Sequence, residues 1–255
     1  MKRALPFVAL FLSLSFLVFS PAVRGQDKKQ PASITPAPKS SPKDPKVESG
    51  FLKRHEGFLT DKEEALKKGP VDLLFVGDSI TDAWRRGDQY KLFQERWGKH
   101  NPLNLGIGGD RTQHVLWRLQ NGEVEGLKPK VVVLMIGTNN LGSKDSVEDT
   151  IAGVKAVVGS LRDKLPDSKI LLLAVFPRGM EPDNAFRAQI KSVNEAIAKL
   201  DDGGKHVKYL DIGPKFLAAD GTLTKEIMPD ALHPNEKGYQ IWADAIQPTL
   251  DEMMK

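Results

Sequence analysis

One serine in this sequence stands where it could act as a nucleophile. Ser79 closes the turn Gly77-Asp78-Ser79, which ends the largely apolar run 71–76, and helix-compatible residues follow at once. A serine at such a strand–turn–helix junction is exposed at the carboxyl edge of a sheet, where the N–H groups of the new helix can face an anion. The ordinary alternative is that Asp78 or Ser79 only caps the helix. A catalytic role for Ser79 therefore requires partners elsewhere in the chain.

The segment Asp230-Ala231-Leu232-His233-Pro234 supplies a candidate general base together with a carboxylate. The following proline disfavours helical geometry at His233, and Asp230, three residues earlier, can fold round to the imidazole. The other four histidines, at positions 55, 100, 114 and 206, lack such a local arrangement, so satisfied or solvated side chains are expected there. Asp230 and His233 are therefore predicted to act with Ser79.

The elements that must position these residues follow from the hydrophobic periodicity after Gly50. Apolar runs of strand length are expected at 71–76, 102–105, 130–136, 170–176 and 207–212. Helical patterns are expected around Tyr90, Phe93 and Trp97, around 115–119, at 147–165 and 185–200, and from about 235 onward. Strands alternating with helices indicate βαβ units, and hence a parallel sheet with helices on both sides.

Three of these strands end in polar or glycine-rich turns, at Ser79, Gly109 and Asn139. In a parallel sheet such turns emerge at the same edge. Residues far apart in the sequence are therefore predicted to converge on one crevice, and this convergence matters more than any single motif.

The first 49 residues differ from the rest in composition. A basic start at Met1-Lys2-Arg3, an apolar run over 4–19 and small residues up to Gly25 are typical of a secretory signal peptide, with an uncleaved membrane anchor as the alternative. Residues 26–49 are rich in Pro, Lys, Ser and Ala and are expected to form a disordered linker. The folded domain is predicted to span 50–255, and the protein to be secreted or periplasmic.

Charge and cysteine content exclude several classes of protein. The chain carries a formal charge of +4, but eight Lys/Arg against three Asp/Glu give residues 1–49 a charge of +5, which leaves −1 for the remainder. The basic character thus belongs to the leader and linker, and no nucleic-acid footprint is expected on the domain. Without cysteine, the chain has neither disulfides nor a thiolate metal site.

Four blocks, in this order along the chain, resemble the SGNH or GDSL hydrolase superfamily: 77–79, 104–110, 137–139, and Asp230 with His233. Within it, segments 104–119, 137–140 and 176–179 are most similar to the catalytic subunits of platelet-activating factor acetylhydrolase IB. The resemblance covers about Phe51 to the C-terminus. The leader and linker depart from that subfamily, whose animal members are intracellular, so its substrate and partners are not carried over.

The resemblance implies a flavodoxin-like three-layer α/β/α sandwich with a five-stranded parallel sheet. It also implies carboxylic ester hydrolysis with Ser79 as nucleophile, His233 as base and Asp230 orienting the imidazole. The oxyanion hole would combine the backbone N–H groups of Ser79 and Gly109 with the side-chain amide of Asn139. No metal or organic cofactor is required by this mechanism. Members of the resembling subfamily form dimers, so a homodimer is implied as well.

The substrate is less strongly indicated. Ile80, Thr138 and Leu232 are bulky or branched residues that adjoin the predicted nucleophile, oxyanion amide and base. In the resembling subfamily these positions border a small acyl pocket, which implies a preference for acetyl or other short acyl esters, although Ile80 and Leu232 also suit a core. Arg178 is a candidate contact for the alcohol part of the ester, a carbohydrate or a lipid, but a structural salt bridge suits it equally. Arg111 has the same ambiguity.

The sequence leaves two alternative functions beside the esterase. One is a non-catalytic carbohydrate- or lipid-binding module on the same scaffold, and the intact motif residues argue against it. The other treats the glycine-rich turn 106–109 as a dinucleotide loop, but that turn lacks the G-x-G-x-x-G spacing and follows the second strand.

Overall fold

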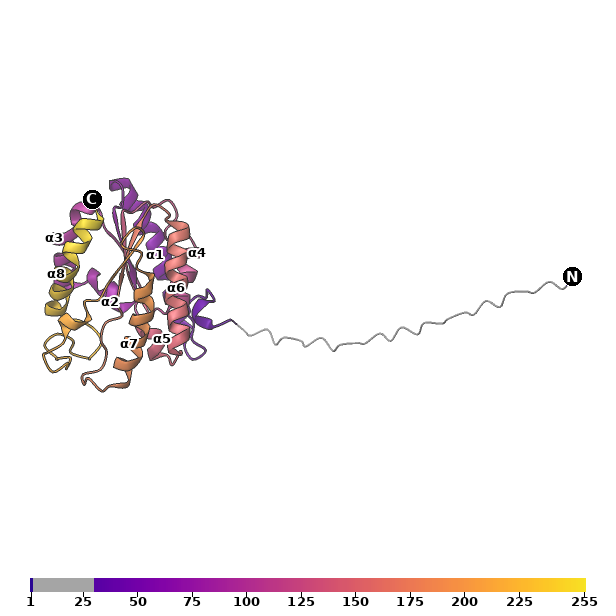
Figure 1. Ribbon diagram of the computed structural model, residues 1–255. Coiled ribbons are helices and arrows are strands. Elements are labelled where there is room, and N and C mark those ends of the chain that lie inside the picture. The colour runs from indigo at the N-terminus through magenta and orange to yellow at the C-terminus, as the bar shows by residue number, and fades with distance from the viewer. Residues whose placement is uncertain (2–29) are drawn as a thin grey trace.

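The computed structural model describes Met1 and residues 30–255. Residues 2–25 of the predicted signal peptide and residues 26–29 of the predicted linker lie outside the described part. A five-stranded parallel sheet in the order β2-β1-β3-β4-β5 forms the centre, with helices on both sides (Figure 1). The strands are β1 (Leu73–Gly77), β2 (Leu103–Gly106), β3 (Val131–Met135), β4 (Lys169–Leu173) and β5 (Val207–Leu210). The predicted α/β sandwich, with its flavodoxin-like strand order, is confirmed.

The helices form two layers. One face of the sheet carries α1 (Lys46–Lys68), α4 (Thr112–Gln120), α6 (Val147–Lys164) and α7 (Ala185–Ile197), and the other carries α3 (Gly87–Trp97) and α8 (Glu236–Met253). Two short helices, α2 (Ser79–Asp82) and α5 (Thr138–Gly142), begin just after β1 and β3. Single 3₁₀ turns are η1 (Ala32–Ile34), η2 (Ala83–Arg85), η3 (Gly98–His100), η4 (Ala198–Leu200) and η5 (Gly213–Phe216).

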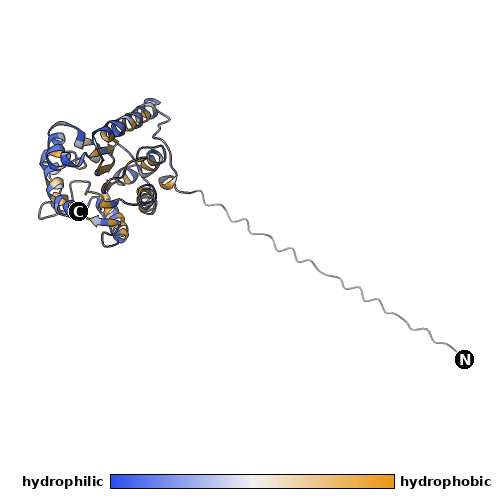
Figure 2. Cartoon of the chain, turned by 90° about the horizontal axis from the view of Figure 1, so that it is seen from above, coloured by the Kyte–Doolittle hydropathy of each residue, from blue (hydrophilic) through white to orange (hydrophobic). Residues whose placement is uncertain are grey.

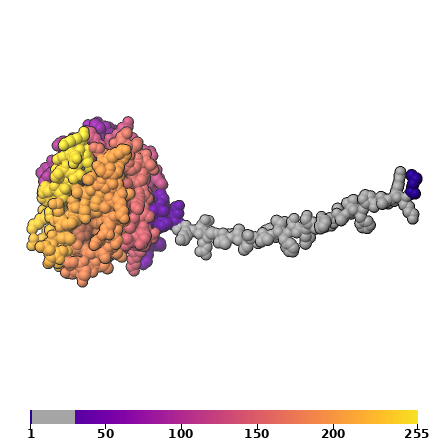
Figure 3. Space-filling view, viewed as in Figure 1, coloured from indigo at the N-terminus to yellow at the C-terminus, as the bar shows by residue number. Residues whose placement is uncertain are grey.

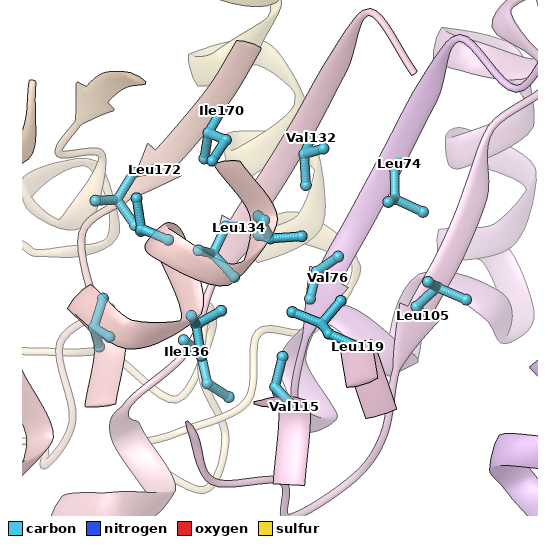
Figure 4. Close-up of a cluster of buried hydrophobic side chains, with 14 of the residues drawn as sticks. Leu74, Val76, Leu105, Val115, Leu119, Val132, Leu134, Ile136, Ile170 and Leu172 are labelled. Carbon is cyan, nitrogen blue, oxygen red and sulfur yellow. The ribbon is translucent and has the colours of Figure 1, made fainter. Parts of the chain in front are cut away.

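Both faces of the sheet are buried, because the inner strands are continuous apolar runs whose side chains alternate between the two layers. Leu74 and Val76 pack with residues of β3 and β4 on the α1–α4–α6–α7 side, as Figure 4 shows. Leu73 and Phe75 point to the opposite core, which contains α3 and α8. Viewed from above, the helices place hydrophilic residues outward and hydrophobic residues toward the interior (Figure 2).

The register brings three strand ends level. Gly77 pairs with Gly106 on β2 and with Met135 on β3. A Cβ at Gly77 would lie 2.6 Å from Met135 O, and one at Gly106 would lie 2.4 Å from Asp82 N, so glycine allows α2 to pack directly over these ends. The turns after β1, β2 and β3 therefore leave the sheet at one edge.

Residues 30–49 differ from the predicted linker. Ser33 is buried and η1 packs against α4 and α6, while α1 begins at Lys46, four residues before the predicted domain boundary. Figure 3 shows the indigo residues that follow the grey trace lying against the edge of the domain. Composition indicates only how much apolar surface a segment can bury, whereas this segment is held by hydrogen bonds to its own backbone groups: the Thr112 hydroxyl donates to Ser33 O at 2.8 Å, and Ala37 N donates to Gln113 O at 3.2 Å.

Two further details differ from the sequence expectations. Tyr90 is 47% exposed, and Trp84 takes its place in the aromatic cluster with Phe93 and Trp97. The long helix α1 was not predicted, since its polar sequence carries only a narrow apolar face, with Phe51 and Phe58 buried. Across residues 30–255 we find no helix that combines the length and the apolar character needed to cross a membrane.

Candidate active site

The β1–α2 turn presents the Ser79 hydroxyl. Asp78, and not Ser79, caps the helix: its Oδ1 accepts a hydrogen bond from Ile80 N at 3.0 Å. Ser79 is the first helical residue and is only partly buried. Because Asp78 is the residue that caps the helix, the hydroxyl of Ser79 is available for another partner.

That partner is His233. Ser79 Oγ lies 2.9 Å from His233 Nε2, and His233 Nδ1 lies 2.6 Å from Asp230 Oδ2. The serine and the histidine are 154 residues apart in the chain. The three predicted residues therefore form one hydrogen-bonded chain, the geometry in which an imidazole can accept a serine proton while a carboxylate orients the ring.

The Asp230–His233 loop is held by its own backbone. Asp230 Oδ1 accepts hydrogen bonds from Leu232 N at 3.1 Å and from His233 N at 2.7 Å. Ala231 has φ +60°, which turns the chain back, and Gly179 N donates to Ala231 O at 3.0 Å. Partial burial works to raise the pKa of Asp230, but the hydrogen bonds from His233 and Leu232 outweigh it and lower that pKa. Asp230 is therefore ionised at neutral pH, as an orienting carboxylate must be.

The glycine turn and α5 lie beside the serine. A Cβ at Gly108 would lie 3.9 Å from Ser79 Cβ, which places this turn against the nucleophile candidate. Gly109 has φ +73°, a conformation that favours glycine. Asn139 Nδ2 donates to Asp110 O at 3.0 Å, which fixes the amide and leaves its second N–H free. Within residues 30–255, the N–H groups of Ser79 and Gly109 make no hydrogen bond, so all three predicted oxyanion donors are available.

The family of this chain is shown by comparison with known proteins. The family model described as GDSL-like Lipase/Acylhydrolase matches residues 75–241. The chain belongs to this family.

The similar proteins fall within one class of enzyme. Subunit alpha1 of platelet-activating factor acetylhydrolase IB from Homo sapiens is 36% identical over 205 residues, which cover 80% of this chain and 84% of that protein. Subunit alpha2 from Rattus norvegicus is 38% identical over 189 residues, 74% of this chain and 78% of that protein. A crystal structure of an acetyl xylan esterase, AlAXEase, has a TM-score of 0.61 and 25% identity, and covers 70% of this chain and 98% of that chain. The protein is an ester hydrolase.

In this GDSL hydrolase a second Asp–His pair corrects one sequence expectation. His206 was predicted to lack a local carboxylate, yet its Nδ1 lies 3.0 Å from Asp202 Oδ2 and its backbone N–H donates to the same side chain. The pair precedes β5 and so lies at the amino edge of the sheet, opposite the edge that carries Ser79. Position in the sheet, rather than local pairing, distinguishes His233 from His206.

Two of the remaining histidines, His55 and His114, have satisfied side chains. His55 Nδ1 lies 2.8 Å from Glu123 Oε1 in the interior. His114 Nδ1 accepts a hydrogen bond from Arg111 N at 3.1 Å, and burial, with neighbouring positive charges, lowers the pKa of His114 to about 3. His114 is therefore a neutral acceptor that caps α4.

The predicted substrate-contacting residues differ in accessibility. Ile80 is 1% exposed and belongs to the α3–α8 core, Thr138 is also buried, and Leu232 is half-buried. Arg178 donates to Thr138 O at 3.2 Å and its guanidinium lies 4.2 Å from the Phe186 ring. Arg178 thus braces α5. Arg111, the other ambiguous arginine, lies 3.8 Å from Asp145.

A buried charge network behind the glycine turn was missed at the sequence level. Arg118 Nε donates to Asp110 Oδ2 at 2.9 Å, and its Nη1 binds Glu123, which in turn contacts His55. Burial alone would lower the pKa of Arg118, but Glu123 and Asp110 raise it, so the guanidinium stays charged. The only sequence signal was an arginine on the otherwise apolar face of the helix that carries Val115 and Leu119.

Asp78 is the second unexpected group. Burial, together with the nearby Asp110 carboxylate, raises the pKa of Asp78 to about 7, against opposing effects of the Ile80 N–H, His233 and Lys39. Asp78 Oδ2 has no hydrogen-bond partner among the described residues. Within residues 30–255 no group of three or more His, Asp or Glu side chains is placed to hold a metal ion.

Proposed function

We propose that this protein is a serine esterase that hydrolyses short-chain carboxylic esters, acetyl esters above all, through Ser79, His233 and Asp230. The observation that carries the proposal is the continuous hydrogen-bonded chain from Ser79 Oγ through the imidazole to Asp230, at 2.9 and 2.6 Å. It lies at the carboxyl edge of a parallel sheet, where open α/β folds bind their ligands.

In the first half of the reaction His233 Nε2 takes the hydroxyl proton as Ser79 Oγ attacks the ester carbonyl. Asp230 holds the ring through Nδ1–H and stabilises the imidazolium that forms. The C–O bond to the alcohol then breaks, His233 gives its proton to the leaving oxygen, and an acyl-Ser79 ester remains. Water activated by the same imidazole hydrolyses that ester, and Ser79 recovers its proton.

The carbonyl oxygen becomes negatively charged in each tetrahedral intermediate. The free N–H groups of Ser79 and Gly109 and the second N–H of the Asn139 amide are its donors in this proposal. Donors fixed in this way stabilise the anion without reorganising, and removal of one such donor typically costs ~10² to 10³ in kcat.

The acetyl preference is supported by the names of similar proteins, an acetylhydrolase and an acetyl xylan esterase. Ile80 and Thr138, which adjoin Ser79 and Asn139, are packed into the domain, so their bulk adds no separate support for a small acyl pocket. The alcohol part of the substrate is proposed to be a carbohydrate or a lipid.

The test uses p-nitrophenyl esters of increasing acyl length. The highest kcat/KM is expected for acetate, and a maximum at octanoate or longer would contradict the acyl preference. Ser79→Ala should abolish hydrolysis and labelling by a fluorophosphonate while the protein stays folded. If the wild-type protein resists the fluorophosphonate, a non-catalytic binding module on this scaffold becomes the better description. A screen of acetylated xylo-oligosaccharides against short-chain lipid esters then identifies the alcohol.

Export is part of the same proposal. The basic start followed by the largely apolar run 4–19 supports a cleaved leader and hence a secreted or periplasmic enzyme. Mass spectrometry of the protein from its native host should give a mature N-terminus near Gln26. An intact Met1 on the membrane-associated protein would favour the uncleaved anchor instead.

A further inference from the structure

Lys39 contacts the glycine turn from a segment that the family match does not include. The match covers residues 75–241, whereas Lys39 lies between η1 and α1. Its Nζ donates to Gly108 O at 2.5 Å and lies 2.8 Å from Asp110 Oδ1. The Lys39 side chain is 16% exposed and Asp110 is fully buried. One largely buried ammonium therefore contacts the residues on both sides of Gly109.

We propose that Lys39 is a positioning residue for the oxyanion hole, which orients and polarises the Gly109 N–H. Gly108 O and the N–H of Gly109 belong to the same peptide unit, and that unit is planar and trans. In a trans peptide the C=O and the N–H point in opposite directions. An ammonium that fixes the oxygen on one side of this peptide therefore also fixes the direction of the N–H on the other side, in a turn that lies beside Ser79.

The charge on Lys39 matters as well as its position. A charge-assisted hydrogen bond is stronger than a neutral one, and a peptide whose oxygen is so bound becomes a better N–H donor. The glycine turn requires such help, because Gly108 and Gly109 are both exposed and glycine restricts its own backbone least. Without Lys39 the 108–109 peptide would rotate more freely and lose preorganised donor strength.

The same ammonium acts on a second oxyanion donor. Lys39 contacts the side chain of Asp110, and the backbone oxygen of Asp110 accepts a hydrogen bond from the Asn139 amide at 3.0 Å. Arg118 holds the other carboxylate oxygen of Asp110 at 2.9 Å. Lys39 and Arg118 therefore clamp Asp110 from two sides, and Asp110 in turn aims the Asn139 side chain. Two of the three proposed donors, at Gly109 and Asn139, depend on this arrangement.

The fold delivers Lys39 to this place from both directions along the chain. On the N-terminal side, Ser33 O and Ala37 N are bonded to Thr112 and Gln113 in α4. On the C-terminal side, Phe51 of α1 lies under the ammonium, with 5.7 Å between Nζ and the ring centroid. The segment that was expected to be a linker is thus a fixed part of the catalytic edge.

Kinetic measurements distinguish this role from a purely structural one, in which Lys39 only holds the segment in place. The inference rests on the proposed serine mechanism, so Ser79→Ala is measured alongside. Lys39→Met removes the charge and the donor, and should lower kcat about 10- to 100-fold, a part of the ~10² to 10³ expected for a lost oxyanion donor. KM for p-nitrophenyl acetate should change less than about threefold, because the donor acts mainly in the transition state.

Three comparisons make the test decisive. Lys43→Met, an exposed lysine of the same segment, controls for loss of charge and should keep full kcat. Lys39→Arg keeps the charge and should retain most of the activity. Inhibition by a trifluoromethyl ketone, which forms a tetrahedral oxyanion on the serine, should weaken in Lys39→Met by the same factor as kcat/KM. If Lys39 only held the segment in place, Lys39→Met would lower thermal stability and leave both the ketone affinity and kcat unaltered.

The outcomes separate the two proposals. If Ser79→Ala is inactive while folded Lys39→Met keeps wild-type kcat and ketone affinity, the positioning role is refuted and the esterase mechanism stands. If Ser79→Ala remains active, the serine mechanism itself fails. Should Lys39→Met not fold, Lys39→Gln, which keeps a neutral donor, replaces it, and wild-type kcat in that variant refutes the contribution of charge.

Discussion

Replacement of Asp78 by asparagine should make the stability of this esterase less sensitive to alkaline pH. Asp78 is fully buried beside the nucleophile, with Oδ1 bound to Ile80 N and Oδ2 without a partner among the described residues. Asparagine has nearly the same shape, keeps an oxygen for the Ile80 N–H, and cannot ionise. The substitution therefore isolates the charge of Asp78.

The magnitude follows from the pKa. Burial raises the pKa of Asp78 from 3.8 to about 7. Between these two values the unfolded chain ionises Asp78 while the folded protein keeps it protonated, so the wild-type protein loses stability as the pH rises through this window, and the loss is complete above it. A rise of about three pH units at ~1.36 kcal/mol each corresponds to about 4 kcal/mol of unfolding free energy.

The assay is urea unfolding of wild type and Asp78→Asn at pH 4.5 and pH 8. The stability of the variant relative to wild type should increase by a few kcal/mol between these two pH values. Other ionisable groups are shared by the two proteins and largely cancel in the comparison. Asp163→Asn, at an exposed position of α6, is the control and should shift stability equally at both pH values. A relative stability of Asp78→Asn that changes by less than ~1 kcal/mol would refute the reasoning from burial.

Three further substitutions test the site. Asn139→Ala should lower kcat by ~10² to 10³ in a folded protein, and unchanged turnover on p-nitrophenyl acetate would remove Asn139 from the oxyanion hole. Arg118→Met removes the guanidinium that binds two buried carboxylates and leaves Asp110 only Lys39 and Glu123 only His55, so it should destabilise the protein by ~3 to 5 kcal/mol in urea unfolding; a loss below ~1 kcal/mol would contradict a net contribution of the network. Gly109→Ala forces φ +73° on an alanine at a cost of ~1 to 2 kcal/mol, although its Cβ would have room at 3.7 Å from Lys39 Nζ. Its melting temperature should fall together with kcat, and a more stable variant would contradict the observed backbone conformation.

Local sequence patterns were sufficient to predict those features whose interacting residues lie close together in the sequence. The alternation of apolar runs with helical stripes predicts the five parallel strands, since each strand is buried on both faces. The edge at which Ser79, Gly109 and Asn139 meet follows from strand direction alone. The Asp230–His233 pairing is also local, because three residues separate the carboxylate from the imidazole.

Other features depended on contacts between distant segments. Composition predicted a linker over residues 26–49, but η1 packs against α4 and α6, α1 begins at Lys46, and Lys39 reaches the glycine turn 69 residues further along the chain. His206 and His233 each pair with a nearby aspartate, but His206 directly precedes β5 and so lies at the amino edge of the sheet, whereas His233 is brought to Ser79 by a contact across 154 residues. No sequence pattern indicated the contact of Lys39 with the glycine turn.

The sequence by itself therefore determined the α/β class, the polar turns and the candidate reactive side chains, since periodicity and turn chemistry act over a few residues. The tertiary structure decided which backbone amides are fixed around the serine and which buried charges hold them. Lys39, Asp110 and Arg118 become one cluster only when the N-terminal segment, the glycine turn and α4 are packed together. The physical reason is that electrostatic partners are selected by distance in space, which the order of residues does not specify.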